Sequence, residues 1–175
     1  MIAGMPHDSA AAYWWPASLT TSRLALRPIE SSDVPEIARL WTDPEVRRYL
    51  GGPVAQQTVR ERRNACVGAP GALSVVRQED GVVVGLVTVE RGGRDGRTEV
   101  SYQFLPEYWG CGYAREAVAA AVDWASAEVP SQFPGVVAVT QEANGRSRHL
   151  LEALGATLVD SFVEWQEPQV LYAFH

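Results

Sequence analysis

Two glycines one residue apart, Gly110 and Gly112, stand directly before a stretch with helical periodicity. From Ala114 onward, small and apolar residues recur every three or four positions, as at Ala117 and Ala121, which is typical of one face of a helix. The first N–H groups of a helix have no partner within it and carry a partial positive charge. Glycines leave room for an anion to reach them. The pattern predicts a phosphate or pyrophosphate site, the alternative being a tight connection without a ligand.

Two better-known phosphate-binding loops do not match this stretch. A Walker loop continues from its last glycine with Lys and Ser or Thr, whereas Tyr113 follows Gly112. A dinucleotide-binding loop needs a third glycine where Arg115 stands. These departures argue against a nucleotide-binding module of either type.

The same stretch resembles the acyl-CoA-binding motif of the GNAT N-acetyltransferases, Arg/Gln-x-x-Gly-x-Gly/Ala, which falls on positions 109 to 114. Its first position is Trp109, a departure from the motif. The run Tyr-Trp-Gly-x-Gly-Tyr-Ala-x-Glu-Ala is similar to the variant of the ribosomal-protein-alanine N-acetyltransferase branch. A second match to that branch runs from Arg23-Leu-x-Leu-Arg-Pro through Trp41-Thr-Asp-Pro-Glu-Val-x-x-Tyr-Leu50. The resemblance covers residues 20 to 174.

This resemblance implies acetyl-CoA as cosubstrate. The pantetheine arm would lie beside the strand that precedes the glycine loop, and the pyrophosphate would bind the loop's N–H groups. A conserved amide of the family, which holds pantetheine, falls on Asn144, for which a helix cap is the alternative role. Cys111 is interpreted as a small filler, or otherwise as a redox-sensitive thiol. The expected cofactor-binding residues are Phe104 and Leu105, both through their backbone, with Trp109, Gly110, Cys111, Gly112, Tyr113, Ala114, Arg115 and Asn144.

Acetyl transfer to an amine also needs a base and a group that stabilises the departing sulfur. Glu99 is the candidate base, because it lies on the strand before the loop, on the face opposite Val100. The alternative is an ordinary surface carboxylate. Many GNAT enzymes have a Tyr acid seven positions after the Asn, and here Leu151 stands there. The resemblance implies Ser147 as the donor instead, unless its hydroxyl bonds its own helix backbone.

The acceptor is expected to be a primary amine, either a protein N-terminus or a small molecule. An unperturbed α-amine has a pKa of about 8, against about 10.4 for lysine, so it is the easier nucleophile at neutral pH. Four aromatic residues are candidates to line its site, with core packing as the alternative for at least half of them: Trp41, Tyr49, Trp165 and Tyr172.

Composition excludes several other functions. The 175 residues are 46% hydrophobic and 21% charged, which suits one globular domain. A net charge of −6 argues against binding to nucleic acid or an anionic membrane, and no apolar run is long enough to span a bilayer. Two cysteines and three scattered histidines predict neither a disulfide framework nor a metal site. Without a secretory signal, the expected location is the cytoplasm.

The elements that must position these groups follow the order β-α-α-β-β-β-α-β-α-β-β. This order predicts an α/β fold with a central mixed sheet and helices on both faces, as in the GNAT fold. Residues 1–19 are expected to be an N-terminal arm and residues 20–175 one domain. Tyr13-Trp14-Trp15 is interpreted as covering an edge of the core, or alternatively as a homodimer contact.

Together these observations predict an acetyl-CoA-dependent N-acetyltransferase in which the amine attacks directly within a ternary complex. The alternative is a non-catalytic acyl-CoA-binding or sensor domain of the same fold, which the missing Tyr acid at Leu151 leaves open.

Overall fold

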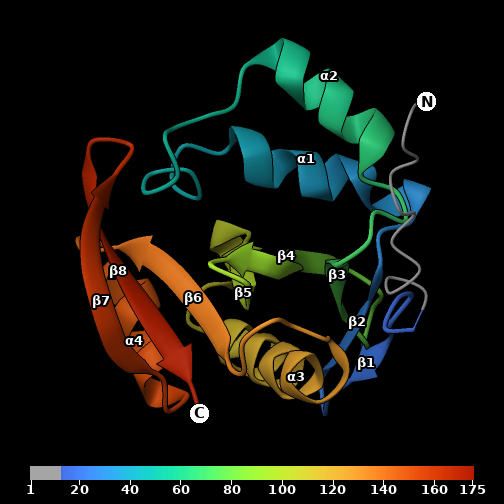
Figure 1. Ribbon diagram of the computed structural model, residues 1–175. Coiled ribbons are helices and arrows are strands. Elements are labelled where there is room, and N and C mark those ends of the chain that lie inside the picture. The colour runs from blue at the N-terminus through green and yellow to red at the C-terminus, as the bar shows by residue number, and fades with distance from the viewer. Residues whose placement is uncertain (1–12) are drawn as a thin grey trace, which may run out of the picture.

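The computed structural model describes residues 13–175, which form one eight-stranded sheet with helices on both faces (Figure 1). The strand order is β1-β2-β3-β4-β5-β6-β8-β7. The elements are β1 (Leu19–Thr20), β2 (Leu24–Pro28), η2 (Ser31–Asp33), α1 (Val34–Thr42), α2 (Gln56–Ala65), β3 (Ala72–Arg77), β4 (Val83–Arg94), β5 (Arg97–Phe104), η3 (Pro106–Tyr108), α3 (Tyr113–Glu128), β6 (Val136–Gln141), α4 (Gly145–Ala153), β7 (Thr157–Glu164) and β8 (Glu167–Phe174). The predicted α/β fold with a mixed sheet is therefore confirmed.

Alternation along the strands sorts the core into two sides of the sheet. Val100 and Phe104 of β5 belong to the large cluster that also contains Ala117 and Val118 of α3 and Leu151 of α4. A second cluster on the opposite face joins α1 to β3 and β4. Figure 1 shows α1 and α2 on one side of the sheet and α3 on the other. Consequently, successive residues of β5 face different helix layers.

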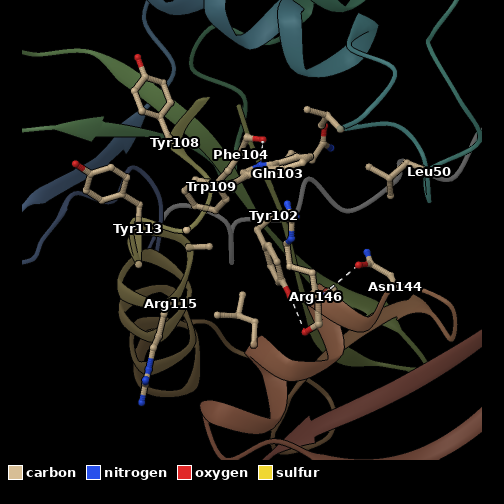
Figure 2. A pocket seen from close by; sticks show the side chains of 16 residues that line it. Leu50, Tyr102, Gln103, Phe104, Tyr108, Trp109, Tyr113, Arg115, Asn144 and Arg146 are labelled. Atoms are coloured by element: carbon tan, nitrogen blue, oxygen red, sulfur yellow. Dashed lines mark hydrogen bonds between the residues drawn. The ribbon is translucent and has the colours of Figure 1, made fainter. Parts of the chain in front are cut away.

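β5 and β6 are parallel neighbours that soon diverge. Their register comprises the pairs Thr98↔Val136 and Glu99↔Val137, although β5 continues to Phe104. Beyond Glu99, the edge of β5 that faces β6 has no strand partner in this register. Figure 2 shows the Tyr102 side chain of β5 pointing toward the beginning of α4, beside this divergence. The divergence leaves backbone hydrogen-bonding groups of β5 available to a ligand.

Two expectations about local structure are wrong. Asp43-Pro44 predicts the start of a short helix over residues 43–50, with Pro at its first position, but these residues form successive turns. The Asp43 carboxylate accepts from the N–H groups of Glu45 and Val46, which is the pattern of a helix N-cap. The Arg47 guanidinium donates to the carbonyls of Leu50 and Gly52, and Gly51 and Gly52 adopt positive φ, so the turns end without continuing as a helix.

The tip of the last hairpin also differs from the expected turn at Glu167-Pro168. The turn lies at Trp165 and Gln166, which both adopt positive φ, and Pro168 pairs with Val163 inside the ladder. Positive φ at two successive residues is the geometry of a type I′ turn, which needs two loop residues only. The Trp165 side chain is 85% exposed at this tip.

The N-terminal segment reaches the core within the described residues. Trp14 is buried and its ring lies 5.9 Å from that of Trp124 in α3, whereas Tyr13 is exposed. Trp14 thus covers an edge of the core, as one interpretation expected. Residues 1–12 of the predicted arm lie outside the described part of the chain, and the division at residue 20 stays a prediction.

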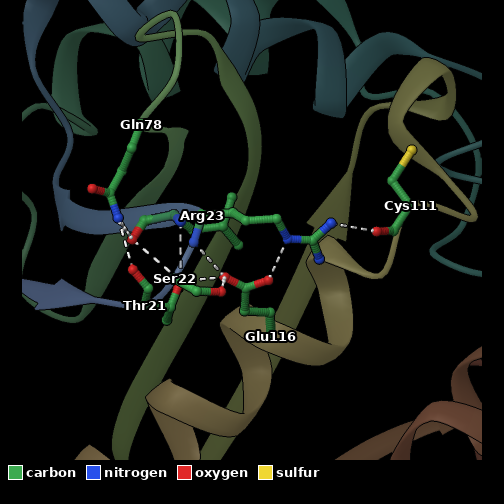
Figure 3. Close-up of polar contacts among 7 residues, drawn as sticks. Thr21, Ser22, Arg23, Gln78, Cys111 and Glu116 are labelled. Atoms are coloured by element: carbon green, nitrogen blue, oxygen red, sulfur yellow. Dashed lines mark hydrogen bonds and ion pairs between the residues drawn. The ribbon is translucent and has the colours of Figure 1, made fainter.

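A polar network ties α3 to the connection between β1 and β2 (Figure 3). The Glu116 carboxylate accepts from Thr21 Oγ1 at 2.6 Å, from Ser22 Oγ at 3.2 Å and from both the backbone N–H and Nε of Arg23 at 2.8 Å. The Arg23 guanidinium also donates to the Cys111 carbonyl at 2.9 Å. Arg23 therefore joins the first turn of α3 to the glycine loop that precedes it.

We predict that Glu116→Gln lowers the free energy of unfolding at neutral pH by about 2 kcal/mol, because hydrogen bonds to a charged group are lost. Burial alone would raise the pKa of Glu116, but donation by Thr21 and Arg23 outweighs it and holds the pKa at about 2. An unfolded Glu titrates near about 4.3, so the stabilisation is present above that pH and disappears as the pH falls toward about 2.

Urea unfolding at a series of pH values tests this prediction. The gap in stability between the parent protein and Glu116→Gln should narrow below about pH 4. Asp123→Asn, which removes an exposed carboxylate from the same helix, is the matched control and should change stability little. An equal effect of both substitutions at neutral pH would contradict the role given to Glu116.

Candidate active site

The first cavity lies between the glycine loop, β5 and the start of α4, and has a volume of about 320 Å³ (Figure 2). Most of the residues expected to bind a cofactor line it, with Ser147 beside them. The predicted residues at its wall are Phe104, Trp109, Gly110, Gly112, Tyr113, Ala114, Arg115, Asn144 and Ser147. A cavity of this size, with few polar groups, suits a small ligand or part of a larger one.

The glycine loop presents an uncapped helix N-terminus to this cavity. Gly110 and Gly112 have φ of +76° and +81°, a region in which side chains are strained. Gly112 is the N-cap of α3 and offers no side chain to the N–H groups of the first turn. A Cβ at Gly110 would meet nothing within 4 Å, so the loop is open to the cavity. These free donors can hold an anion.

Four of the residues expected to bind a cofactor have backbone or side-chain groups that already contact other parts of the protein. The Trp109 N–H donates to the Pro106 carbonyl, and the Leu105 N–H donates to the Val84 carbonyl. The Phe104 carbonyl accepts from Trp109 Nε1 at 2.8 Å, and Leu105 is fully buried. Cys111 is exposed, does not line this cavity, and its carbonyl is bound by Arg23. The role of these four residues in cofactor binding stays a prediction.

Arg146 supplies a cation beside the first position of the loop motif. Its guanidinium lies 4.1 Å from the centroid of the Trp109 ring. The motif that this stretch resembles has Arg or Gln where Trp109 stands, so the stacked Arg146 brings a positive charge to the same place. Figure 2 shows the Arg115 side chain pointing along α3, away from Arg146. Arg148 instead donates to the Tyr172 hydroxyl.

One buried polar atom in the wall has no partner within the protein. Gln103 Oε1 is buried and accepts no hydrogen bond from the described residues. An orphaned acceptor of this kind is costly unless a ligand or water donates to it. Because Gln103 lines the first cavity, a ligand amide would satisfy it there.

At the start of α4, Asn144 and Ser147 are joined to each other and to β5. Asn144 Oδ1 accepts from the Ser147 N–H at 3.2 Å, which is the helix-cap role. The Ser147 hydroxyl lies 2.6 Å from the Tyr102 hydroxyl. Among the described residues, the hydrogen bond of Ser147 Oγ is with the Tyr102 hydroxyl and not with a carbonyl of its own helix.

The second cavity, of about 570 Å³, lies on the other face of β5. Glu99 and Ser101 form part of its floor, and its walls come from the loop after α1 and the tip of the last hairpin. Tyr49 and Trp165 line it, as expected. Trp41 and Tyr172 line neither cavity: Trp41 is 6% exposed in the core beside α1, and Tyr172 is 0% exposed beneath α4. Their aromatic bulk serves core packing.

Glu99 is held in an ion triad at this floor. Arg94 Nε lies 3.5 Å from Glu99 Oε2, and Arg94 Nη2 lies 3.2 Å from Glu164 Oε2 of β7. Burial raises the pKa of Glu99, and the positive charge of Arg94 opposes that rise. A carboxylate with a raised pKa binds a proton more tightly than an exposed carboxylate does, so it is the stronger base. A carboxylate whose pKa lies below neutral pH is still ionised at neutral pH.

Several residues of the two cavities were not identified from the sequence. Tyr102 alternates with Val100 and Phe104, so its position predicted the core and not a hydroxyl at a cavity. Arg94 follows Gly92-Gly93, a pattern that indicated a turn, yet β4 extends to Arg94. Arg146, two residues after Asn144, was expected near the phosphate end together with Arg115 and Arg148, and only the fold brings its guanidinium over Trp109.

Residues 13–175 contain neither of two further classes of site. Within that range no group of His, Cys, Asp and Glu side chains is arranged to hold a metal ion. No helix of the described chain has the length and hydropathy needed to cross a membrane.

Comparison with known proteins assigns the fold to a family. The profile described as "Acetyltransferase (GNAT) domain" matches residues 23–157. The uncharacterized protein YkkB of Bacillus subtilis is 26% identical over 162 residues, covering 88% of this chain and 93% of that protein.

Solved structures agree with this assignment. A GNAT-family acetyltransferase of Bacillus anthracis has a TM-score of 0.79 at 22% identity, covering 90% of this chain and 98% of the other. The ribosomal-protein-S5-alanine acetyltransferase of Vibrio fischeri has a TM-score of 0.65 at 20% identity, covering 90% and 96%. The profile match spans most of the chain and includes the glycine loop and the start of α4. The chain therefore belongs to the GNAT family and is an N-acetyltransferase.

Proposed function

We propose that this protein transfers the acetyl group of acetyl-CoA to a primary amine by direct attack in a ternary complex. One observation carries the proposal: the two cavities adjoin along β5, at its divergence from β6. Ser101 lines one cavity and Tyr102 lines the other, and Leu50 borders both. An acyl donor and an acceptor in these cavities would meet at this strand, which is the arrangement that direct transfer requires.

The residues of the first cavity suit the parts of acetyl-CoA. The N–H groups from Gly110 onward suit the pyrophosphate, and Arg146 adds positive charge beside them. The unpartnered Gln103 Oε1 suits an amide N–H of pantetheine. When bound, acetyl-CoA supplies an activated acyl group and a thiolate leaving group.

In the second cavity Glu99 is the proposed base. Its carboxylate accepts one proton from the acceptor ammonium, directly or through water, so that the nitrogen lone pair is free to attack. Arg94 limits the rise in the pKa of this carboxylate, and its guanidinium also forms an ion pair with Glu164. Tyr49 and Trp165 would border the acceptor beside Glu99.

The proposed acceptor is the primary amine of a protein N-terminus. A small-molecule primary amine is the alternative. The Vibrio fischeri neighbour is named for an alanine of ribosomal protein S5. The lower pKa of an α-amine also favours it over a lysine side chain. A panel of peptides beginning with alanine and of small diamines, read by thiol release, would distinguish the two.

Gly110→Glu is predicted to weaken acetyl-CoA binding at least about 100-fold, or ~3 kcal/mol, because a carboxylate would face the pyrophosphate and the residue must adopt positive φ. No clash accompanies it, since a Cβ there meets nothing within 4 Å. Calorimetric titration with acetyl-CoA measures the effect. Gly68 is the control position, because its φ is also positive and a Cβ there also meets nothing within 4 Å, but it lines neither cavity. The Gly68→Glu variant should therefore bind acetyl-CoA normally. Normal binding by Gly110→Glu would place the cofactor elsewhere.

Glu99→Gln is predicted to lower kcat by roughly 10²–10⁴-fold, the range of a lost general base, with acetyl-CoA affinity within about twofold of the parent. The two readouts separate an enzyme from a domain that only binds acyl-CoA. The control is Glu79→Gln: Glu79 is exposed in the turn between β3 and β4 and lines neither cavity. Retention of full turnover by Glu99→Gln would remove Glu99 as the base.

Arg94→Gln is predicted to move the acidic limb of the kcat/KM profile to higher pH. Burial raises the pKa of Glu99 and Arg94 lowers it, so loss of the guanidinium leaves burial less opposed. The carboxylate then stays protonated, and inactive as a base, up to a higher pH. Arg91→Gln, which alters an exposed arginine of the same hairpin that donates to the Pro130 carbonyl, should leave the limb in place. A limb that moves to lower pH in Arg94→Gln would refute this account.

A further inference from the structure

The hydroxyl of Tyr102 has no part in the function described so far, yet it lies beside the first cavity and against Ser147. Tyr102 comes from β5 and lines the first cavity. Its oxygen is 2.6 Å from Ser147 Oγ and 3.5 Å from the Ser147 carbonyl. Both contacts are with one residue, and Figure 2 shows the ring directed toward that residue at the start of α4.

We infer that Tyr102 acts through Ser147 as a two-hydroxyl relay that donates a hydrogen bond to the sulfur leaving the acetyl group. Tyr102 is the positioning residue of the relay, and Ser147 is the group that touches the sulfur. The inference rests on the proposed acetyl transfer and adds to it a source of stabilisation for the leaving group.

The faces of β5 support this division of labour. Glu99 and Ser101 point toward the acceptor cavity, whereas Tyr102 belongs to the side of the sheet that α3 and α4 cover. Base and relay therefore lie on opposite faces of one strand, within three residues of each other. Proton removal from the amine and stabilisation of the sulfur occur on opposite sides of the reacting carbon, so this separation matches the chemistry.

The relay also accounts for the residue at position 151. Leu151 is a fully buried residue of α4 and belongs to the core cluster. Tyr102 packs against the same cluster and directs its hydroxyl at Ser147. A tyrosine hydroxyl thus reaches the start of α4 from β5, instead of from the helix itself.

Either of the two hydroxyls can donate in this hydrogen bond, and the relay assigns the donation to Tyr102. If Tyr102 donates to Ser147 Oγ, the Ser147 proton is free to point into the cavity. Burial raises the pKa of Tyr102 to about 12, so the phenol keeps its proton throughout the range in which the enzyme would work. A neutral donor behind Ser147 polarises the serine hydroxyl and strengthens its hydrogen bond to an anion.

The step balances without a proton leaving the relay. The thioester C–S bond breaks, its electron pair leaves on sulfur, and the C–N bond of the amide has formed. Glu99 takes one ammonium proton before the attack, and solvent water takes the second proton from the nitrogen as the amide forms. Ser147 donates a hydrogen bond to the thiolate, Tyr102 donates one to Ser147 Oγ, and both residues keep their protons. Solvent protonates the thiolate on release, and Glu99 returns its proton to solvent.

A binding experiment tests the relay without turnover. A relay that stabilises thiolate must lower the pKa of the CoA thiol in the complex, so CoA affinity must rise with pH through the thiol titration. Desulfo-CoA lacks the sulfur and corrects for every other titrating group. We expect the affinity ratio of CoA to desulfo-CoA to rise about tenfold between about pH 6.5 and about pH 9.5, corresponding to one pKa unit.

Tyr102→Phe keeps the ring and removes the hydroxyl, and it should reduce this rise to less than about threefold, since most of the stabilisation is lost. Ser147→Ala should do the same, and the double variant should be no worse than either, because both hydroxyls act in one chain. Tyr172→Phe is the matched control: its hydroxyl also anchors α4, through Arg148 and Glu152, but lies outside the cavity. It should retain the full rise.

The outcomes separate the two proposals. Failure of both CoA and desulfo-CoA to bind the parent protein would overturn the proposed function itself. Binding of both with a ratio independent of pH would overturn the relay and leave acetyl transfer standing. If Tyr102→Phe does not fold, as judged by circular dichroism, Ser147→Ala decides alone, and an unchanged ratio in that variant contradicts the relay.

Discussion

The divergence of β5 from β6 is the constraint on which the site depends. These two strands are parallel, and their register comprises two residue pairs, Thr98↔Val136 and Glu99↔Val137. A continued ladder would use the backbone groups of β5 and would close the space between the two cavities. Because the ladder stops at Glu99, the base candidate sits at the last paired position, and the residues after it face an opening. The glycine loop follows directly from the end of the same strand.

Alternation along β5 then decides which chemistry occurs on which side. Glu99 and Ser101 face the acceptor cavity, and Tyr102 faces the cofactor side. Both groups are held from outside the strand: Arg94 and Glu164 fix Glu99, and Ser147 fixes the Tyr102 hydroxyl. The loop is held in the same way, because Arg23 binds both Glu116 and the Cys111 carbonyl. Ser147 and Arg23 come from distant parts of the chain, whereas Arg94 lies on the neighbouring strand, five residues before Glu99.

Local patterns predicted the parts of this structure that depend on local physics. The sequence could predict three features that depend on residues a few positions apart: the glycines before α3, the alternation of β5 and the cap at Asn144. It could not predict the partners of Arg23, Arg94 and Tyr102, since those contacts exist only once the sheet has formed. The expected helix after Asp43 was wrong, although Asp43 caps the first turn, because the Arg47 guanidinium binds carbonyls at the end of the segment and Gly51 and Gly52 adopt positive φ. Trp41 and Tyr172 illustrate a further limit, because an aromatic residue carries no local sign of whether it faces a cavity or the core.

A crystal structure of the protein with CoA tests the central claim most directly. The account predicts that the sulfur lies in the divergence of β5 and β6, with the Ser147 hydroxyl within hydrogen-bonding distance and the pyrophosphate on the N–H groups that follow Gly110. Glu99 would then lie on the opposite face of β5 from the Tyr102 hydroxyl. A sulfur placed away from Ser147, or a pyrophosphate bound elsewhere than at the glycine loop, would contradict it.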